Sequence, residues 1–146
     1  PQVALTTDII VGFCGETEGQ FQRTLDLLEE VEFDKVHVAC YSPRPGTIAW
    51  RRMEDDVPWE EKERRRRAVE EVQEGIAAGR NARLLGQRLE VLVEGREKGK
   101  WQGRTRTDKL VFFEDGAADY QGRLVQVRVT KTGPWSLQGV VEEAKG

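Results

Sequence analysis

The sequence predicts an α/β segment followed by an all-β barrel of five strands, of the OB-like type. Two observations predict this division. Residues 1–80 alternate apolar runs with helical spacing, as βα units of a parallel sheet do. Residues 81–146 contain five short runs of period-two alternation, separated by turns that contain Gly and Asp. Such spacing is typical of a small closed or nearly closed barrel. We therefore expect two domains, 1–80 and 81–146.

The first strand and helix are predicted from 1–31. Val3–Phe13 is a nearly continuous apolar run with β-branched residues, which favours a strand buried on both faces of a parallel sheet. Thr17 and Gln20 have the spacing of a capping box, in which each side chain accepts a backbone hydrogen bond of the other residue. Apolar residues then recur at helical spacing, so the helix is expected over 18–31.

A second strand is predicted over Phe33–Tyr41, and a long charged helix from Pro58 to about Leu84. Pro suits the first turn of a helix because its missing N–H would have no helical partner there. Two strands and two helices bury only a marginal core and cannot cover both faces of a parallel sheet. We therefore expect residues 1–80 to be the C-terminal end of a larger α/β domain.

The barrel half is the basic half. Residues 1–80 carry 11 Lys and Arg against 17 Asp and Glu, whereas 81–146 carry 12 against 9. This asymmetry indicates a polyanionic partner for the second half. Lys100, Arg104 and Arg106 alternate along one predicted strand face, where they would repel each other unless an anion lies across them. A phosphate backbone is the natural candidate; the alternative is an ordinary solvated face.

Several other features limit the function. No apolar run approaches the roughly 20 residues that span a bilayer, and mean hydropathy is −0.62. We therefore expect a cytoplasmic protein with no membrane partner. Two cysteines cannot build a disulfide scaffold, and a single histidine excludes a His-rich metal site. We expect no catalytic residue and no metal ligand in the chain. Cys14 and His37 are weak candidates for a nucleophile or a base, and the Arg64–Arg67 run is expected to pair with neighbouring Glu residues at helical spacing.

The aromatic side chains of the basic half have two interpretations. Exposed rings would stack on nucleobases, whereas buried rings would supply the bulk that so small a core needs. We expect most of these rings to fill the barrel. The residues concerned are Trp101, Phe112, Phe113 and Trp135.

Four motifs resemble those of one family. TTDIIVGFCGET (6–17) and YSPRPGT (41–47) resemble consecutive strand-end segments of the radical-SAM methylthiotransferases. GRTRTDK (103–109) and WSLQG (135–139) resemble the TRAM domain of the tRNA-modifying, MiaB-type branch, a small RNA-binding β-barrel. The resemblance implies that 1–80 are the last βα units of a radical-SAM partial barrel. It covers essentially the whole chain.

The resemblance also implies a function. The parent enzyme would methylthiolate C2 of an isopentenyl-adenosine near the anticodon, using S-adenosylmethionine and two [4Fe–4S] clusters. Its partners here would be the tRNA anticodon stem-loop and the upstream part of the same enzyme. The residues implied to border the cofactor are Ile10, Gly12, Gly15, Glu16, Tyr41 and Pro43. From the cation row and these motifs together, we expect Lys100, Arg104, Arg106, Lys109 and Trp135 to bind RNA.

Three departures accompany the resemblance. Cys14 replaces a motif proline, and Asp108 replaces a motif asparagine. The cysteine triplets that ligate the family's clusters are absent, so the chain by itself is expected to be inactive. Two alternatives remain: a sister branch acting on threonylcarbamoyl-adenosine or a ribosomal protein, and a stand-alone RNA-binding module without catalysis.

Overall fold

The structure is a computed structural model that describes residues 3–115 and 119–145. The chain divides into two compact units, one from Leu5 to Ile76 and one built mainly from Ala77 onward. Each unit is described by itself. No helix in the described part of the chain combines the length and apolarity needed to cross a bilayer.

The Leu5–Ile76 unit is built on two parallel strands, β1 (Thr6–Val11) and β2 (Lys35–Cys40). Between them runs α1 (Glu18–Val31), so the predicted βαβ order is confirmed. A short helix, α2 (Ile48–Arg52), was not predicted; it follows the proline-containing loop. The long helix α3 (Trp59–Ala82) begins directly after Pro58, as expected.

The predicted capping box at the start of α1 is present. Gln20 N donates to Thr17 Oγ1 over 3.1 Å, and Thr17 N donates to Gln20 Oε1 over 2.9 Å. These two bonds satisfy backbone groups that the first turn of the helix leaves without partners. The sequence therefore determines where α1 begins.

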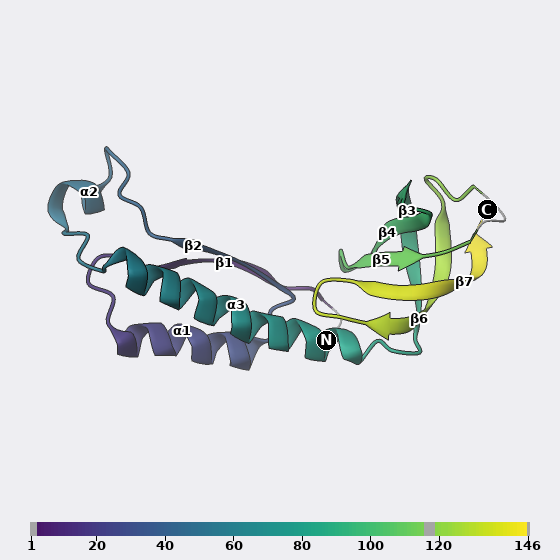
Figure 1. The fold of residues 1–146 in the computed structure, drawn as a ribbon, viewed down its shortest axis with the longest axis horizontal. Helices are drawn as coiled ribbons and strands as arrows, with labels where there is room; N and C mark the ends of the chain where they lie inside the picture. The colour runs from purple at the N-terminus through teal and green to yellow at the C-terminus, as the bar shows by residue number, and fades with distance from the viewer. Residues whose placement is uncertain (1–2, 116–118, 146) are drawn as a thin grey trace. The chain divides into compact units, whose positions relative to one another are not determined.

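The core of this unit lies on one face of the two-stranded sheet. Phe21 and Leu28 of α1 and Val69 of α3 pack there against Val11, and Figure 1 shows both helices along the same side of β1 and β2. Burial alternates along both strands, and Ile10 is 61% exposed on the other face. The expectation of a strand buried on both faces is wrong here, because both long helices cover the same face.

The second unit is a closed five-stranded barrel with the order β3-β4-β5-β7-β6. The predicted number of strands and the closure are confirmed. Closure joins β5 to β7 in the parallel sense, with Val111 paired to Leu137; the other pairs are antiparallel. The strands are β3 (Arg88–Glu97), β4 (Lys100–Thr105), β5 (Leu110–Phe113), β6 (Leu124–Thr132) and β7 (Leu137–Lys145).

The barrel interior is filled by valines and by three aromatic rings. Trp101, Phe113 and Tyr120 are buried, and both other rings meet the Tyr120 ring edge-on at centroid distances of 5.8 and 5.7 Å. The interpretation that most aromatic rings fill the barrel is therefore confirmed for Trp101 and Phe113. Phe112 is half-buried. Trp135 is the exception, with 60% of its surface exposed.

Candidate functional site

The first candidate site lies where β1 and β2 end. Glu16 N donates to Phe13 O over 2.9 Å, and Gly15 has φ 75°. A turn closed in this way with a left-handed third residue has the geometry of type II, in which Pro is common at the second position. Cys14 occupies that second position. The replacement of the motif proline by Cys14 therefore leaves the turn in place.

Glu16 is held inside this turn. Its Oε1 accepts hydrogen bonds from Gly12 N at 2.8 Å and from Arg65 Nη1 at 2.7 Å, and Arg65 also reaches the Glu16 carbonyl at 3.0 Å. The Arg65 side chain is only 6% exposed. Burial opposes its charge, but hydrogen bonds to Glu16 and Glu61 outweigh that cost and raise the pKa of Arg65. The Glu16 carboxylate therefore links the turn to α3 through hydrogen bonds.

Lys62 links α3 to the end of β2 in a similar way. Its ammonium is buried, with the side chain 3% exposed, and donates to Tyr41 O at 3.0 Å and to Asp55 Oδ1 at 2.7 Å. Burial and a hydrogen bond with Cys14 raise the pKa of the Tyr41 hydroxyl. Gly12 lies directly against Lys62, since a Cβ built there would be 2.2 Å from Lys62 Cγ. Two buried cations of α3 thus hold both strand ends.

The structure gathers most of the residues expected to border a cofactor at this edge. Gly12, Gly15, Glu16 and Tyr41 are held there by the contacts above. Pro43 is exposed in the loop beyond β2, and Ile10 is exposed on the uncovered sheet face. Ile10 is thus the last residue but one of β1, near the carboxyl end of the strand, where parallel sheets bind their ligands.

The residues do not fit an iron–sulfur cluster. Cys14 is buried, and Cys40 Sγ lies 3.4 Å from Glu63 Oε1. Burial and that hydrogen bond raise the pKa of the Cys40 thiol, which disfavours the thiolate that iron requires. Within 3–115 and 119–145, no group of three or more His, Cys, Asp or Glu residues is arranged to hold a metal.

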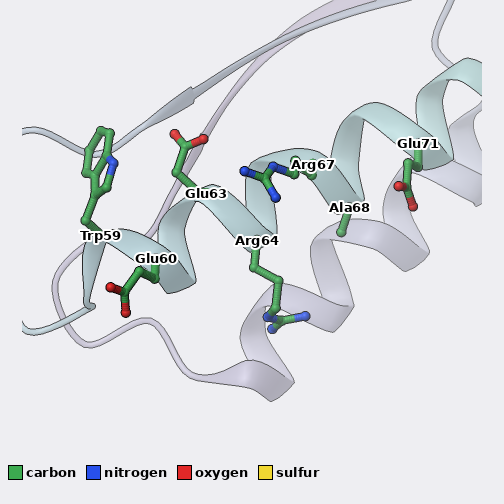
Figure 2. Close-up of a pocket in the computed structure, with 7 residues that line it drawn as sticks. All are labelled: Trp59, Glu60, Glu63, Arg64, Arg67, Ala68 and Glu71. Atoms are coloured by element: carbon green, nitrogen blue, oxygen red, sulfur yellow. The ribbon is translucent and has the colours of Figure 1, made fainter.

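The arginine run of α3 pairs with glutamates, as predicted. Arg64 binds Glu61 at 2.5 Å and Arg66 binds Glu70 at 2.6 Å, while Arg65 is turned inward. A surface hollow of about 580 Å³ follows one side of this helix, and Figure 2 shows the side chains that line it. They are Trp59, Glu60, Glu63, Arg64, Arg67, Ala68 and Glu71. Three acidic and two basic side chains line it, so the hollow has no single charge preference.

The second candidate site lies on the barrel, and it differs from the predicted row of cations. β4 ends at Thr105, so Arg106 lies in the following turn and not on the strand face. The predicted row is therefore wrong for Arg106, whereas Lys100 and Arg104 do share one face of β4. Carboxylates of the same chain also relieve the repulsion: Arg106 Nε lies 3.0 Å from Glu90, and Arg104 Nε lies 3.5 Å from Glu94.

Asp108 has a backbone role in this turn. Its φ of 62° is left-handed, a conformation in which Asn and Asp are several-fold enriched. Asp108 N donates to Thr105 O over 3.0 Å, and Thr105 N donates to Lys109 O over 3.0 Å. Asp therefore replaces the motif asparagine without loss of the turn. It adds a negative charge 4.0 Å from Arg104.

Asn81, in the last turn of α3, joins two turns of the barrel. It is 4% exposed; its Oδ1 accepts from Lys109 Nζ at 2.8 Å, and its Nδ2 donates to Gly133 O at 2.8 Å. The turn that contains Gly133 also carries the exposed Trp135. Sequence reasoning missed Asn81, as it missed Lys62 and Arg65, because no local pattern marks a polar helix residue as buried.

The residues that form the barrel match a known protein family. Residues 82–141 match the family of the TRAM domain.

Whole-chain relatives extend the match beyond that domain. The chain is 57% identical over 143 residues to the tRNA-2-methylthio-N(6)-dimethylallyladenosine synthase of Chloroflexus aurantiacus, which covers 96% of this chain. It is 58% identical to that of a Roseiflexus species over 97% of the chain. It is 49% identical to that of Dehalococcoides mccartyi over 94%. The predicted resemblance to these methylthiotransferases is thereby confirmed. The chain spans about 30% of the length of the first two relatives.

Proposed function

We propose that this chain is part of a tRNA methylthiotransferase, in which its TRAM domain binds the tRNA anticodon stem-loop. The observation that carries the proposal is the continuous identity of 57–58% to two synthases, which extends through both units of the chain. The exposed cations and the exposed tryptophan of the barrel support it. The whole enzyme would methylthiolate C2 of an isopentenyl-adenosine.

The Leu5–Ile76 unit takes the scaffold role in this proposal. Its parallel strands would be the last βα units of a radical-SAM partial barrel, and Ile10, Gly12 and Tyr41 would border S-adenosylmethionine. That cofactor would supply the methyl group when bound. Arg65 and Lys62 keep the strand ends fixed through their bonds to Glu16 and to the Tyr41 carbonyl. The iron–sulfur ligands would come from the upstream part of the enzyme.

RNA binding by the 146-residue chain is the test. An anticodon stem-loop containing isopentenyl-adenosine is titrated by fluorescence anisotropy at several salt concentrations. The logarithm of the association constant should fall linearly with the logarithm of the salt concentration, because each phosphate contact releases counterions. Arg104→Ala with Arg106→Ala should lower the slope by roughly 1.4, if each arginine contacts one phosphate of a single-stranded loop.

The matched control is Arg51→Ala with Arg52→Ala. It removes two exposed cations of α2, outside the barrel, and should leave affinity and slope unchanged. A chain that binds no RNA, or whose affinity does not depend on salt, would contradict the proposed function. Equal weakening by both double variants would show attraction by net charge alone. Salt-dependent binding without preference for isopentenyl-adenosine would still support the TRAM role and leave the base to be recognised elsewhere in the enzyme.

A further inference from the structure

We propose that the RNA contact of this barrel is at one end, where a single unpaired base stacks on Trp135 and the neighbouring phosphates meet the 104–109 turn. The inference rests on the proposed function and specifies where on the barrel the RNA binds. It assigns Asn81 as the positioning residue of this end, and it removes Lys100 from the set of residues that the sequence predicted to bind RNA.

The register of the barrel brings the two parts of this end together. β5 and β7 run parallel with Val111 opposite Leu137. Lys109 and Trp135 each stand two residues before this first pair, in the turns that lead into β5 and β7, so both lie at the same end of the barrel. Asn81 secures this arrangement, since its amide bonds both the Lys109 ammonium and the Gly133 carbonyl. Aromatic ring and cation are therefore held as one unit.

Charge extends around the same end. Arg104 closes β4 together with Arg106 in the next turn, and Lys131 lies exposed near the end of β6, opposite Gln138. The arginines are paired with carboxylates but stay accessible: the Arg106 side chain is 85% exposed, although its partner Glu90 is only 19% exposed, and in the other pair Arg104 is 39% and Glu94 52% exposed. Exposed pairs contribute only about 0–1 kcal/mol. Phosphate oxygens can therefore replace the carboxylates at little cost.

Lys100 lies at the opposite end of β4. It pairs with Glu97, whereas Arg104 pairs with Leu92, so four residues, or about 13 Å of strand, separate the two cations. Acidic residues also lie at the Lys100 end. Glu114 lies 3.9 Å from Lys100, and Asp115 accepts hydrogen bonds from Trp101 and Tyr120. An RNA strand centred on Trp135 would not contact Lys100.

The occupant is an unpaired nucleotide because of the exposed ring. Trp135 is 60% exposed in a turn that Asn81 and the Gly133–Ser136 backbone bond hold in place. Large aromatic rings are costly to expose, and a fixed one offers a stacking platform that any unstacked base can use. A duplex presents no free base face. The surrounding cations then supply the sequence-independent backbone contact.

Four single variants test this assignment in the salt titration described above. Arg106→Ala and Lys100→Ala remove the same charge at opposite ends. Arg106→Ala should weaken binding and lower the salt slope by roughly 0.7, whereas Lys100→Ala should leave both unchanged within about twofold. Trp135→Ala should weaken binding about 5- to 150-fold without a change of slope. Trp135→Phe, which keeps a ring, should recover most of that loss.

Asn81→Ala tests the positioning role. It removes no charge, yet it should lower both the affinity and the salt slope, because the Lys109 ammonium loses its fixed position. A merely structural residue would alter the melting temperature and not the slope among molecules that remain folded. Far-UV circular dichroism checks folding; if Asn81→Ala does not fold, the surface variants at 100, 106 and 135 still decide the matter.

The outcomes separate this inference from the proposed function. Salt-dependent RNA binding that Lys100→Ala weakens as much as Arg106→Ala, or that Trp135→Ala leaves unchanged, would overturn the inference while the proposed function stands. Absence of RNA binding by the wild-type chain would overturn both. Equal affinity for a fully paired duplex and for the loop would also overturn the stacking of an unpaired base.

Discussion

Substitution of Gly12 by Ala should destabilise the Leu5–Ile76 unit far more than substitution of Gly15. Both glycines have φ near 75°, so an alanine at either position costs about 1–2 kcal/mol because it must adopt the left-handed backbone conformation. At Gly15 nothing lies within 4 Å of an added Cβ. At Gly12 the added Cβ would lie 2.2 Å from Lys62 Cγ, an atom close to the backbone of that residue. Lys62 must therefore move as a whole.

The extra cost follows from what Lys62 does. Its buried ammonium would leave the Tyr41 carbonyl and Asp55, and breaking a buried charged interaction costs about 3–5 kcal/mol. Gly12→Ala should thus lower the free energy of unfolding by about 4–7 kcal/mol, against about 1–2 for Gly15→Ala. Urea denaturation followed by circular dichroism at 222 nm measures this, because the long helices lie largely in this unit.

A third variant isolates the cause. In a Lys62→Ala background the clash is absent, so Gly12→Ala should cost no more than Gly15→Ala, about 1–2 kcal/mol. Two results would refute the reasoning. Equal destabilisation by the two glycine variants would show that Lys62 does not fill the space beside Gly12. A full penalty for Gly12→Ala in the absence of the Lys62 side chain would place the cost in the backbone.

Three further predictions concern other positions. Asp108→Asn keeps a residue that tolerates left-handed φ and removes a negative charge from the basic end of the barrel; RNA should bind about two- to fivefold tighter at low salt, and Asp108→Glu should give no gain. Cys14→Pro at the second position of its turn should raise the free energy of unfolding by about 0.4–1 kcal/mol, unless its buried thiol contributes more; a lower urea midpoint would show that it does. Hydrogen bonds from Arg64 lower the pKa of Glu61 from 4.5 to about 2, so its stabilising effect is complete above pH 4.5 and is lost as the pH falls toward 2. Glu61→Gln should therefore flatten this part of the acid melting curve, and an unchanged curve would contradict the assignment.

Local patterns predicted most of the elements. The capping box located the start of α1, Pro58 located the start of α3, and period-two alternation found all five barrel strands. These features depend on residues within one turn or one strand of each other. α2 escaped because a five-residue helix carries no full period of an amphipathic pattern.

The candidate sites were less predictable. The motifs located the strand ends and the Arg104–Lys109 turn, but the alternation was carried one residue too far, because Arg106 follows the last residue of β4. Nothing local marked Lys62, Arg65 or Asn81 as buried, because each bonds to a residue 21 to 52 positions away, at Tyr41, Glu16 and Gly133 respectively. A buried polar side chain is defined by those distant partners and not by its neighbours in the chain.

The sequence alone determined the α/β-then-barrel order, the charge asymmetry between the halves and the family resemblance, since each is a property of short segments. Tertiary structure alone decided which ends of the strands meet. Parallel pairing of β5 with β7 placed Lys109 and Trp135 at the same end of the barrel and left Lys100 at the other end. Packing of α3 likewise buried two cations of its charged segment, which now bond to the ends of the two parallel strands. Both outcomes arise from closure and packing between distant segments, where distance along the chain has little relation to distance in space.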